Sequence, residues 1–166
     1  MIKQFFTTTT DGNIAYHVND DKNRVLNNRK NLEITYGINI SNLRYMNQTH
    51  RCNINIVTKD SNQCIDDCDA LITNQINIPL MVMVADCIPI LIQDKNQKVI
   101  AAVHAGRKST FLNIAQKTVF KMIEEFNCNV QDVKINLGPS IQKCCYEVSS
   151  ELVQIVKNSF GAEFVK

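Results

Sequence analysis

The sequence predicts a mixed α/β domain of the α+β type, in which short apolar strands combine with amphipathic helices. Apolar runs of strand length, such as residues 99–103, indicate strands that are buried on both faces. Apolar residues at helical spacing between Ile114 and Phe126 indicate a helix with one buried face. The 166 residues, 45% of them hydrophobic, match the size of one ordinary domain, and no linker or repeat divides them. We therefore expect a single domain over residues 1–166.

The amino-terminal half predicts two strands, one helix and one polar loop. Apolar residues recur near helical spacing from Asp21 onward, and Gly37 is a plausible stop for that helix. In the second strand, Ile54 and Ile56 share one side, as in a half-buried strand. The expected segments are, in order, a strand at 2–6, a helix at 21–36, a strand at 53–58 and a loop at 60–69.

The carboxyl-terminal half predicts four strands and two helices. Either Ser109 or Thr110 is expected to cap a helix that runs to Phe126. Ser149 is expected to cap a last amphipathic segment that ends before Gly161. The expected strands are residues 80–85, 90–92, 99–103 and 133–137.

Two histidines and one cysteine each follow an apolar, strand-like run: His50, Cys87 and His104. The ends of strands are where binding sites are commonly built. Two imidazoles and one thiolate are ligands that zinc accepts, and three protein ligands leave a fourth tetrahedral position for a reactive water. We therefore interpret the three residues as metal ligands and catalytic residues.

Two other interpretations of the same residues stay open. One is a buried cysteine beside two histidines that are hydrogen-bonded to the backbone. The other is a metal-free hydrolase in which Cys87 is the nucleophile and His104 is its base. A multicopper oxidase is disfavoured, because three histidines in the whole chain are too few for a multicopper cluster.

The composition limits the partners. A net charge of +2, spread without a basic cluster, does not predict a nucleic-acid partner. The longest apolar run, residues 78–92, is interrupted by Pro79, Asp86 and Pro89 and is too short to span a bilayer. Seven cysteines are an odd number with irregular spacing, and no signal peptide precedes the fold, so we expect a reducing cytoplasm.

Five ordered motifs resemble the signature of the YfiH or laccase-domain family. They are Gln48-Thr49-His50, residues 69–75, residues 85–89, residues 101–106 and residues 138–148. Residues 16–21 and Asn28-Arg29-Lys30 also match the amino-terminal pattern of that family. Five motifs in the same order are far more specific than any one of them, and the resemblance covers nearly all of this chain.

The resemblance implies a layered α/β/β/α sandwich, similar to the catalytic domains of cytotoxic necrotizing factors, with His50, Cys87 and His104 as zinc ligands. The family was first labelled multicopper polyphenol oxidoreductase and is now understood as zinc-dependent purine nucleoside phosphorylases that also deaminate adenosine. We therefore expect an enzyme that acts on adenosine, inosine or methylthioadenosine and takes zinc rather than copper. The alternatives are a laccase-like polyphenol oxidoreductase, the metal-free hydrolase, and a nucleoside-binding protein without catalysis.

Five further residues are expected to contact the substrate. Phosphorolysis requires an anion beside the nucleoside, and Arg107 directly follows the motif that contains His104. Deamination requires an acid-base carboxylate, for which Asp86 and Glu147 are the candidates. Gln48 precedes His50 in its motif, and Cys145 adjoins Tyr146 in the last motif.

The expected partners are therefore a purine nucleoside and phosphate. Family members continue well past the point that Lys166 matches. We accordingly expect a pocket that is open on one side, unless a second chain closes it in a homodimer.

Overall fold

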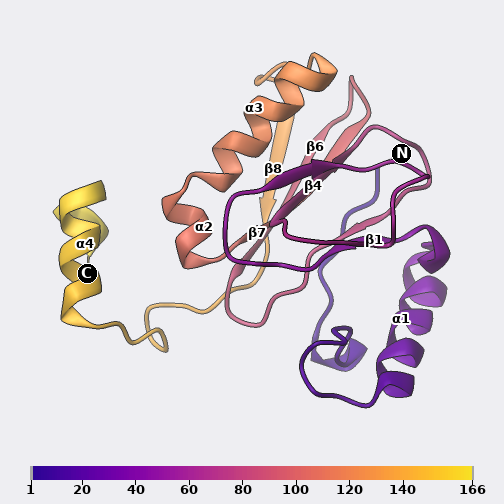
Figure 1. Cartoon of the computed structure of the whole chain (residues 1–166), viewed down its shortest axis with the longest axis horizontal. Helices are drawn as coiled ribbons and strands as arrows, with labels where there is room; N and C mark the ends of the chain where they lie inside the picture. Colours follow the sequence, from indigo (N-terminus) through magenta and orange to yellow (C-terminus); the bar gives the residue numbers. More distant parts are fainter. Residues whose placement is uncertain (1, 166) are drawn as a thin grey trace.

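The computed structural model describes residues 2–165, which form two β-sheets and four α-helices (Figure 1). The helices are α1 (Lys22–Tyr36), α2 (Arg107–Phe111), α3 (Ile114–Phe126) and α4 (Ser150–Phe160). The strands are β1 (Arg44–Met46), β2 (Ile54–Ile56), β3 (Cys64–Ile65), β4 (Ala70–Thr73), β5 (Leu80–Met81), β6 (Ile88–Asp94), β7 (Val99–Ala105) and β8 (Val133–Leu137). Short 3-10 helices lie at Thr9–Asp11, Ile40–Asn42 and Ala162–Phe164.

The smaller sheet has the strand order β3-β1-β5, with both pairs parallel. The larger sheet has the order β2-β4-β7-β6-β8, in which β2 and β4 are parallel and the other pairs are antiparallel. The chain passes three times from the smaller sheet to the larger one, between β1 and β2, between β3 and β4 and between β5 and β6. These three crossings matter below, because each carries a residue of the site or of the hydrogen bonds around it.

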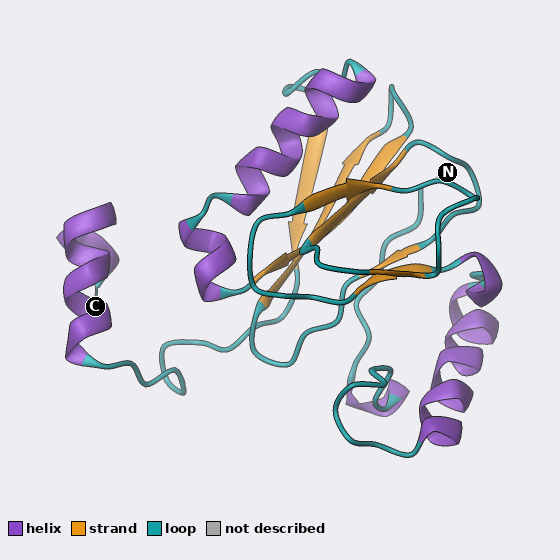
Figure 2. Cartoon of the chain, viewed as in Figure 1, coloured by secondary structure: helices purple, strands orange, loops and turns teal. Residues whose placement is uncertain are grey.

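The elements form α/β/β/α layers, which confirms the expected mixed architecture (Figure 2). Helix α3 packs on β7 and β4 of the larger sheet, and β1 and β5 of the smaller sheet face β4 and β7. Helix α1 lies on the outer side of the smaller sheet, where the Arg29 guanidinium is 4.4 Å from the Tyr45 ring centroid. Helix α4 contains no buried residue, and its Phe160 ring lies 4.9 Å from that of Phe111.

The main core lies between α3 and the larger sheet. Strand β7 is buried at six of its seven positions, as its continuous apolar run predicts. Ile114, Thr118 and Met122 of α3 are fully buried against the sheet, which confirms the expected helix face. A second buried cluster is made of Met46, Val57, Cys68 and Leu71, from β1, β4 and the loops beside them.

Local signals located most helices correctly. Asp21 caps α1 by accepting a hydrogen bond from Arg24 N at 2.8 Å, and Gly37 ends the helix with a left-handed φ of 65°. Ser149 caps α4 as expected. The long helix expected from Ser109 or Thr110 is instead two helices, because Asn113 adopts a left-handed φ of 59°. Ser109 lies inside α2 and caps neither helix.

Three strand expectations were wrong in extent. Residues 2–6 form no strand, and the strand expected at 80–85 is only β5. The strand expected at 53–58 is only β2, and Val57, which directly follows it, is 1% exposed while Ile56 is 37% exposed. The polar stretch 60–69 contains β3, and it ends in the fully buried Asp69.

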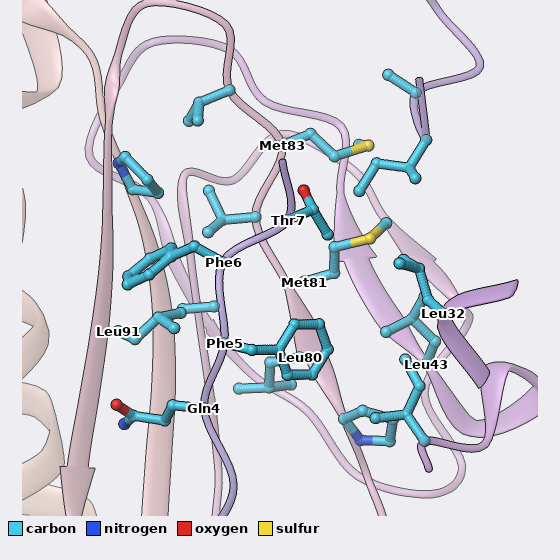
Figure 3. Close-up of a pocket in the computed structure, with 18 of the residues that line it drawn as sticks. Gln4, Phe5, Phe6, Thr7, Leu32, Leu43, Leu80, Met81, Met83 and Leu91 are labelled. Carbon is cyan, nitrogen blue, oxygen red and sulfur yellow. The ribbon is translucent and has the colours of Figure 1, made fainter. Parts of the chain in front are cut away.

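An apolar cavity of about 730 Å³ lies between the amino-terminal segment and the two sheets. Figure 3 shows Phe5 and Phe6 running through it, with Leu80 and Met81 of β5 and Leu91 of β6 around them. Its lining includes Ala85 and Pro89, which stand on either side of Asp86 and Cys87. Within residues 2–165, no helix combines the length and the apolar character needed to cross a membrane.

Candidate metal centre

His50, Cys87 and His104 meet at one point of the fold. The three ligand atoms that they offer all lie within 4.8 Å of one another. The Cys87 Sγ atom is 4.0 Å from His50 Nε2, and the two imidazole rings are perpendicular with centroids 4.6 Å apart. Among the described residues, this is the one group of three or more His, Cys, Asp or Glu side chains placed to hold a metal ion.

The sheet topology explains this meeting better than the expected strand ends do. His104 lies inside β7, and Cys87 directly precedes β6 rather than ending a strand. Because β6 and β7 are antiparallel, Ile88 pairs with Ala105 and Pro89 with His104, so the start of β6 lies beside the end of β7. His50 lies on the crossing between β1 and β2, in the left-handed region at φ 57°. A non-glycine residue is uncommon in this region of backbone conformation.

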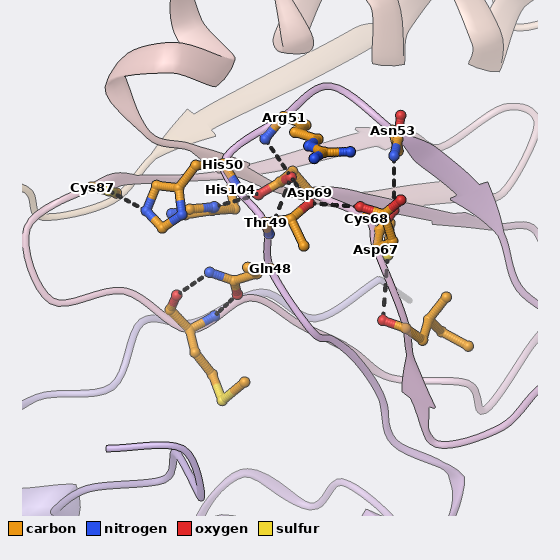
Figure 4. Close-up of polar contacts among 12 residues, drawn as sticks. Gln48, Thr49, His50, Arg51, Asn53, Asp67, Cys68, Asp69, Cys87 and His104 are labelled. Atoms are coloured by element: carbon orange, nitrogen blue, oxygen red, sulfur yellow. Dashed lines mark hydrogen bonds and ion pairs between the residues drawn. The ribbon is translucent and has the colours of Figure 1, made fainter. Parts of the chain in front are cut away.

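Asp69 holds both histidines in place (Figure 4). Its Oδ1 atom lies 2.7 Å from His104 Nδ1 and accepts a hydrogen bond from the His50 backbone N at 2.9 Å. Its Oδ2 atom accepts a hydrogen bond from the Arg51 backbone N at 2.8 Å. The His104 backbone N also donates to the Asp69 carbonyl oxygen at 2.7 Å. With Nδ1 of His104 occupied in this way, Nε2 is the ring nitrogen left for a metal.

The protonation of the site follows from these contacts. Burial tends to raise the pKa of Asp69, but hydrogen bonds from His104, Arg51 and His50 outweigh that effect and hold the pKa below its ordinary value. Burial, together with the nearby carboxylates of Asp86 and Asp69, raises the pKa of the Cys87 thiol. A bound cation would reverse the effect on Cys87, because metal-bound thiols lose their proton.

The residues present fit a metal ion in both donor type and space. The donor set of two imidazole nitrogens and one sulfur suits zinc and other borderline or soft transition metals. Gly106 keeps the space open: a Cβ at this position would lie 2.9 Å from His50 Cδ2, 3.3 Å from Cys87 Sγ and 3.4 Å from His104 Cε1. Any larger residue at position 106 would therefore push on all three side chains.

Sequence reasoning missed Asp69 as a functional residue, although one quoted motif begins with it. The available signal was an acidic residue directly before the apolar run of β4. A carboxylate at the edge of a buried strand requires partners. The sequence does not reveal that His104, 35 residues further on, is one of them, because that contact depends on the pairing of β4 with β7.

The residues expected to contact substrate differ in their exposure and in their position relative to the metal group. Asp86 and Arg107 are exposed neighbours of Cys87 and Gly106. Gln48 is engaged with the backbone of Met83: its Nε2 donates to Met83 O at 2.8 Å, and its Oε1 accepts from Met83 N at 3.0 Å. Cys145 and Glu147 are exposed on the loop between β8 and α4. That loop reaches the site where Ile141 N donates to Asp86 O at 2.9 Å.

A layered α/β/β/α fold with a His-Cys-His group that could hold a metal ion defines the class of protein, and comparisons with known proteins identify its family. The family model described as multi-copper polyphenol oxidoreductase laccase matches residues 6–166, so this chain belongs to that family. In fold, the chain is similar to the YfiH protein of Bacillus licheniformis, with a TM-score of 0.83 and 29% identity. That alignment covers 88% of this chain and 58% of the YfiH chain.

Relatives with assigned activities share about a third of the sequence. The chain is 34% identical over 155 residues to a purine nucleoside phosphorylase of Clostridium acetobutylicum, covering 93% of this chain and 63% of the relative. It is 30% identical over 175 residues to the adenosine deaminase RL5 of an unknown prokaryotic organism, covering 95% of this chain and 66% of that protein. The chain thus spans a little less than two thirds of the length of each of these two relatives.

Proposed function

We propose that this protein acts on purine nucleosides at a zinc ion held by His50, Cys87 and His104, cleaving them with phosphate and deaminating adenosine. Adenosine, inosine and methylthioadenosine are the candidate substrates. The observation that carries the proposal is the grouping of the three ligand atoms within 4.8 Å in a chain of this family. The names of the two relatives, a purine nucleoside phosphorylase and an adenosine deaminase, supply the reaction types.

The chain's own residues prepare the site. When bound, zinc would supply a Lewis acid that lowers the pKa of a water and stabilises negative charge. Asp69 fixes the tautomer and the orientation of His104 through the 2.7 Å contact with Nδ1. His104 itself is 2% exposed, so solvent reaches the group from the side of His50 and Cys87, which are less buried.

We assign roles in substrate binding and proton transfer to exposed charged residues near the metal group. Arg107 is the exposed first residue of α2, next to Gly106, and we assign its guanidinium to the phosphate because planar guanidinium groups bind oxyanions through paired hydrogen bonds. Asp86, beside Cys87, and Glu147, on the loop that contacts Asp86 O, are the carboxylates assigned to proton transfer in deamination. Substrate contacts of Gln48 and Cys145 stay predictions.

The polyphenol oxidoreductase named in the family description has less support. A multicopper oxidase requires several copper sites rich in histidine. The chain has three histidines, and the described residues contain one group of potential ligands. The metal therefore proposed is zinc, with copper as the less favoured ion.

We propose a reducing cytoplasm as the cellular setting. All seven are free thiols, which fits a reducing cytoplasm. A nucleic-acid partner is not proposed, because the net charge of +2 is spread along the sequence. A homodimer stays a prediction.

One experiment tests the proposed function. The protein is incubated with adenosine or inosine, with and without phosphate, and the products are separated by chromatography. Free base formed only with phosphate indicates phosphorolysis, and inosine formed from adenosine indicates deamination. Both activities should disappear with a chelator and return with zinc, which separates the proposal from a metal-free hydrolase. Absence of both products from the zinc-loaded protein would contradict the proposal and favour nucleoside binding alone.

A further inference from the structure

Two adjacent cysteines outside the metal group form a second cluster of thiols. Cys144 and Cys145 lie in a turn between β8 and α4, with their Sγ atoms 3.2 Å apart. The turn is held by the Gln142 carbonyl oxygen, which accepts hydrogen bonds from Cys145 N at 2.9 Å and from Tyr146 N at 3.0 Å. The two thiols are therefore presented side by side by a defined backbone.

Packing does not explain this pair. Cysteine is among the most buried residue types, and Cys68 and Cys128 of this chain are buried in that way. Cys144 and Cys145 are both exposed. The other close thiols, Cys64 and Cys68, are four residues apart, and burial raises the pKa of Cys68 to about 12. Among the described cysteines, Cys144 and Cys145 are thus the pair in which the two sulfur atoms are close together and both residues are exposed.

The geometry favours a ligand that bridges the two sulfur atoms, rather than a disulfide bond between them. Disulfides usually join cysteines with Cα atoms at least about 4.4 Å apart. Neighbouring residues in a chain are fixed at about 3.8 Å, so a disulfide here would be strained and easily reduced. A ligand that accepts both sulfurs needs no such bond. Thiolates prefer soft acceptors, and two of them on one acceptor bind far more tightly than one.

We propose that Cys144 and Cys145 form a two-thiol binding site for soft, thiophilic ligands, with trivalent arsenic compounds as the chemical class. In the reaction with an aryl arsenoxide, two S–As bonds form and the arsenic-bound oxygen leaves as water with the two thiol protons. Arsenic stays trivalent and no oxidant is required. The site is distinct from the group of His50, Cys87 and His104, which offers one thiol only.

The test uses the zinc-loaded full chain and phenylarsine oxide. Intact-mass spectrometry should detect one bridged adduct per chain, which a dithiol removes and a monothiol at the same thiol concentration does not. Cys144→Ser and Cys145→Ser should each weaken binding about 100-fold or more, because each leaves one thiol. Both residues are exposed, so both variants should keep the thermal midpoint of the unmodified protein.

Cys64→Ser is the matched control for the other close thiols. It should bind phenylarsine oxide like the unmodified protein, since Cys68 is buried. Loss of the adduct in Cys64→Ser, its persistence in Cys144→Ser, or absence of any bridged adduct on the unmodified protein would each overturn the proposal.

Discussion

Asp69 links the chemistry of the site to the backbone around it. One carboxylate contacts the His104 ring and also binds the backbone nitrogens of His50 and Arg51. It is fully buried, so these contacts are not exchanged with water. The orientation of both histidines therefore depends on a residue that is itself not among the three grouped ligands.

Replacing Asp69 by Asn should weaken metal binding about 10- to 100-fold, the usual effect of removing a group that orients a metal-bound histidine. Competition with a chromophoric chelator measures the affinity. Asp67→Asn is the matched control, because Asp67 is exposed and its carboxylate accepts a hydrogen bond from Thr49 Oγ1 at 2.9 Å. Equal affinities for Asp69→Asn and the unmodified protein would show that Asp69 does not position the ligands.

The depressed pKa of Asp69 also predicts a pH dependence of stability. The folded state favours the carboxylate, so its stabilising contribution is complete above the ordinary Asp pKa of about 3.9 and is lost as the pH falls through the lower folded pKa. Urea denaturation at pH 6 and at pH 3, with chelator present, should show a smaller acid-induced loss in Asp69→Asn than in the unmodified protein. Identical losses would mean that the pKa of Asp69 is not depressed.

At the scale of elements, α3 and the larger sheet supply most of the core. Met122 is fully buried among apolar neighbours, while Phe120 of the same helix is 53% exposed. Met122→Ala should lower the free energy of unfolding by about 2–5 kcal/mol, through lost apolar contact and a cavity. Phe120→Ala should change it by about 0.5 kcal/mol or less. Urea denaturation measures both, and similar losses in the two variants would contradict the described packing of α3.

Elements with local signals were predictable, and elements that depend on a partner were not. Asp21 and Gly37 mark the ends of α1 within the helix sequence itself. A strand, in contrast, exists only where another strand pairs with it, so the apolar residues 2–6 gave a wrong strand. The break at Asn113 was missed for a similar reason, because the apolar spacing continues across it.

The site was predictable to the extent that side-chain chemistry reveals it. His50, Cys87 and His104 are uncommon residue types with metal-binding donors, and they meet as expected. The reason given for their meeting was partly wrong, because Cys87 precedes β6 and His104 lies within β7. Register and sheet order bring them together, and neither can be read from single segments.

At the scale of the whole molecule, the site joins the two sheets. His50 lies on the first crossing from the smaller to the larger sheet, Cys87 lies on the third, and His104 belongs to the larger sheet. An ion bound to all three residues would tie the first and third crossings to β7. Metal binding should therefore depend on the assembled fold and on every one of the three ligands.

The metal content of purified variants tests this account most directly. Elemental analysis of the zinc-reconstituted, desalted protein should give about one zinc per chain, and His50→Ala, Cys87→Ser and His104→Ala should each lose most of it. His17→Ala, which changes the exposed third histidine, should keep its zinc. Zinc retained by Cys87→Ser and His104→Ala, or lost from His17→Ala, would contradict the assignment of the metal to His50, Cys87 and His104.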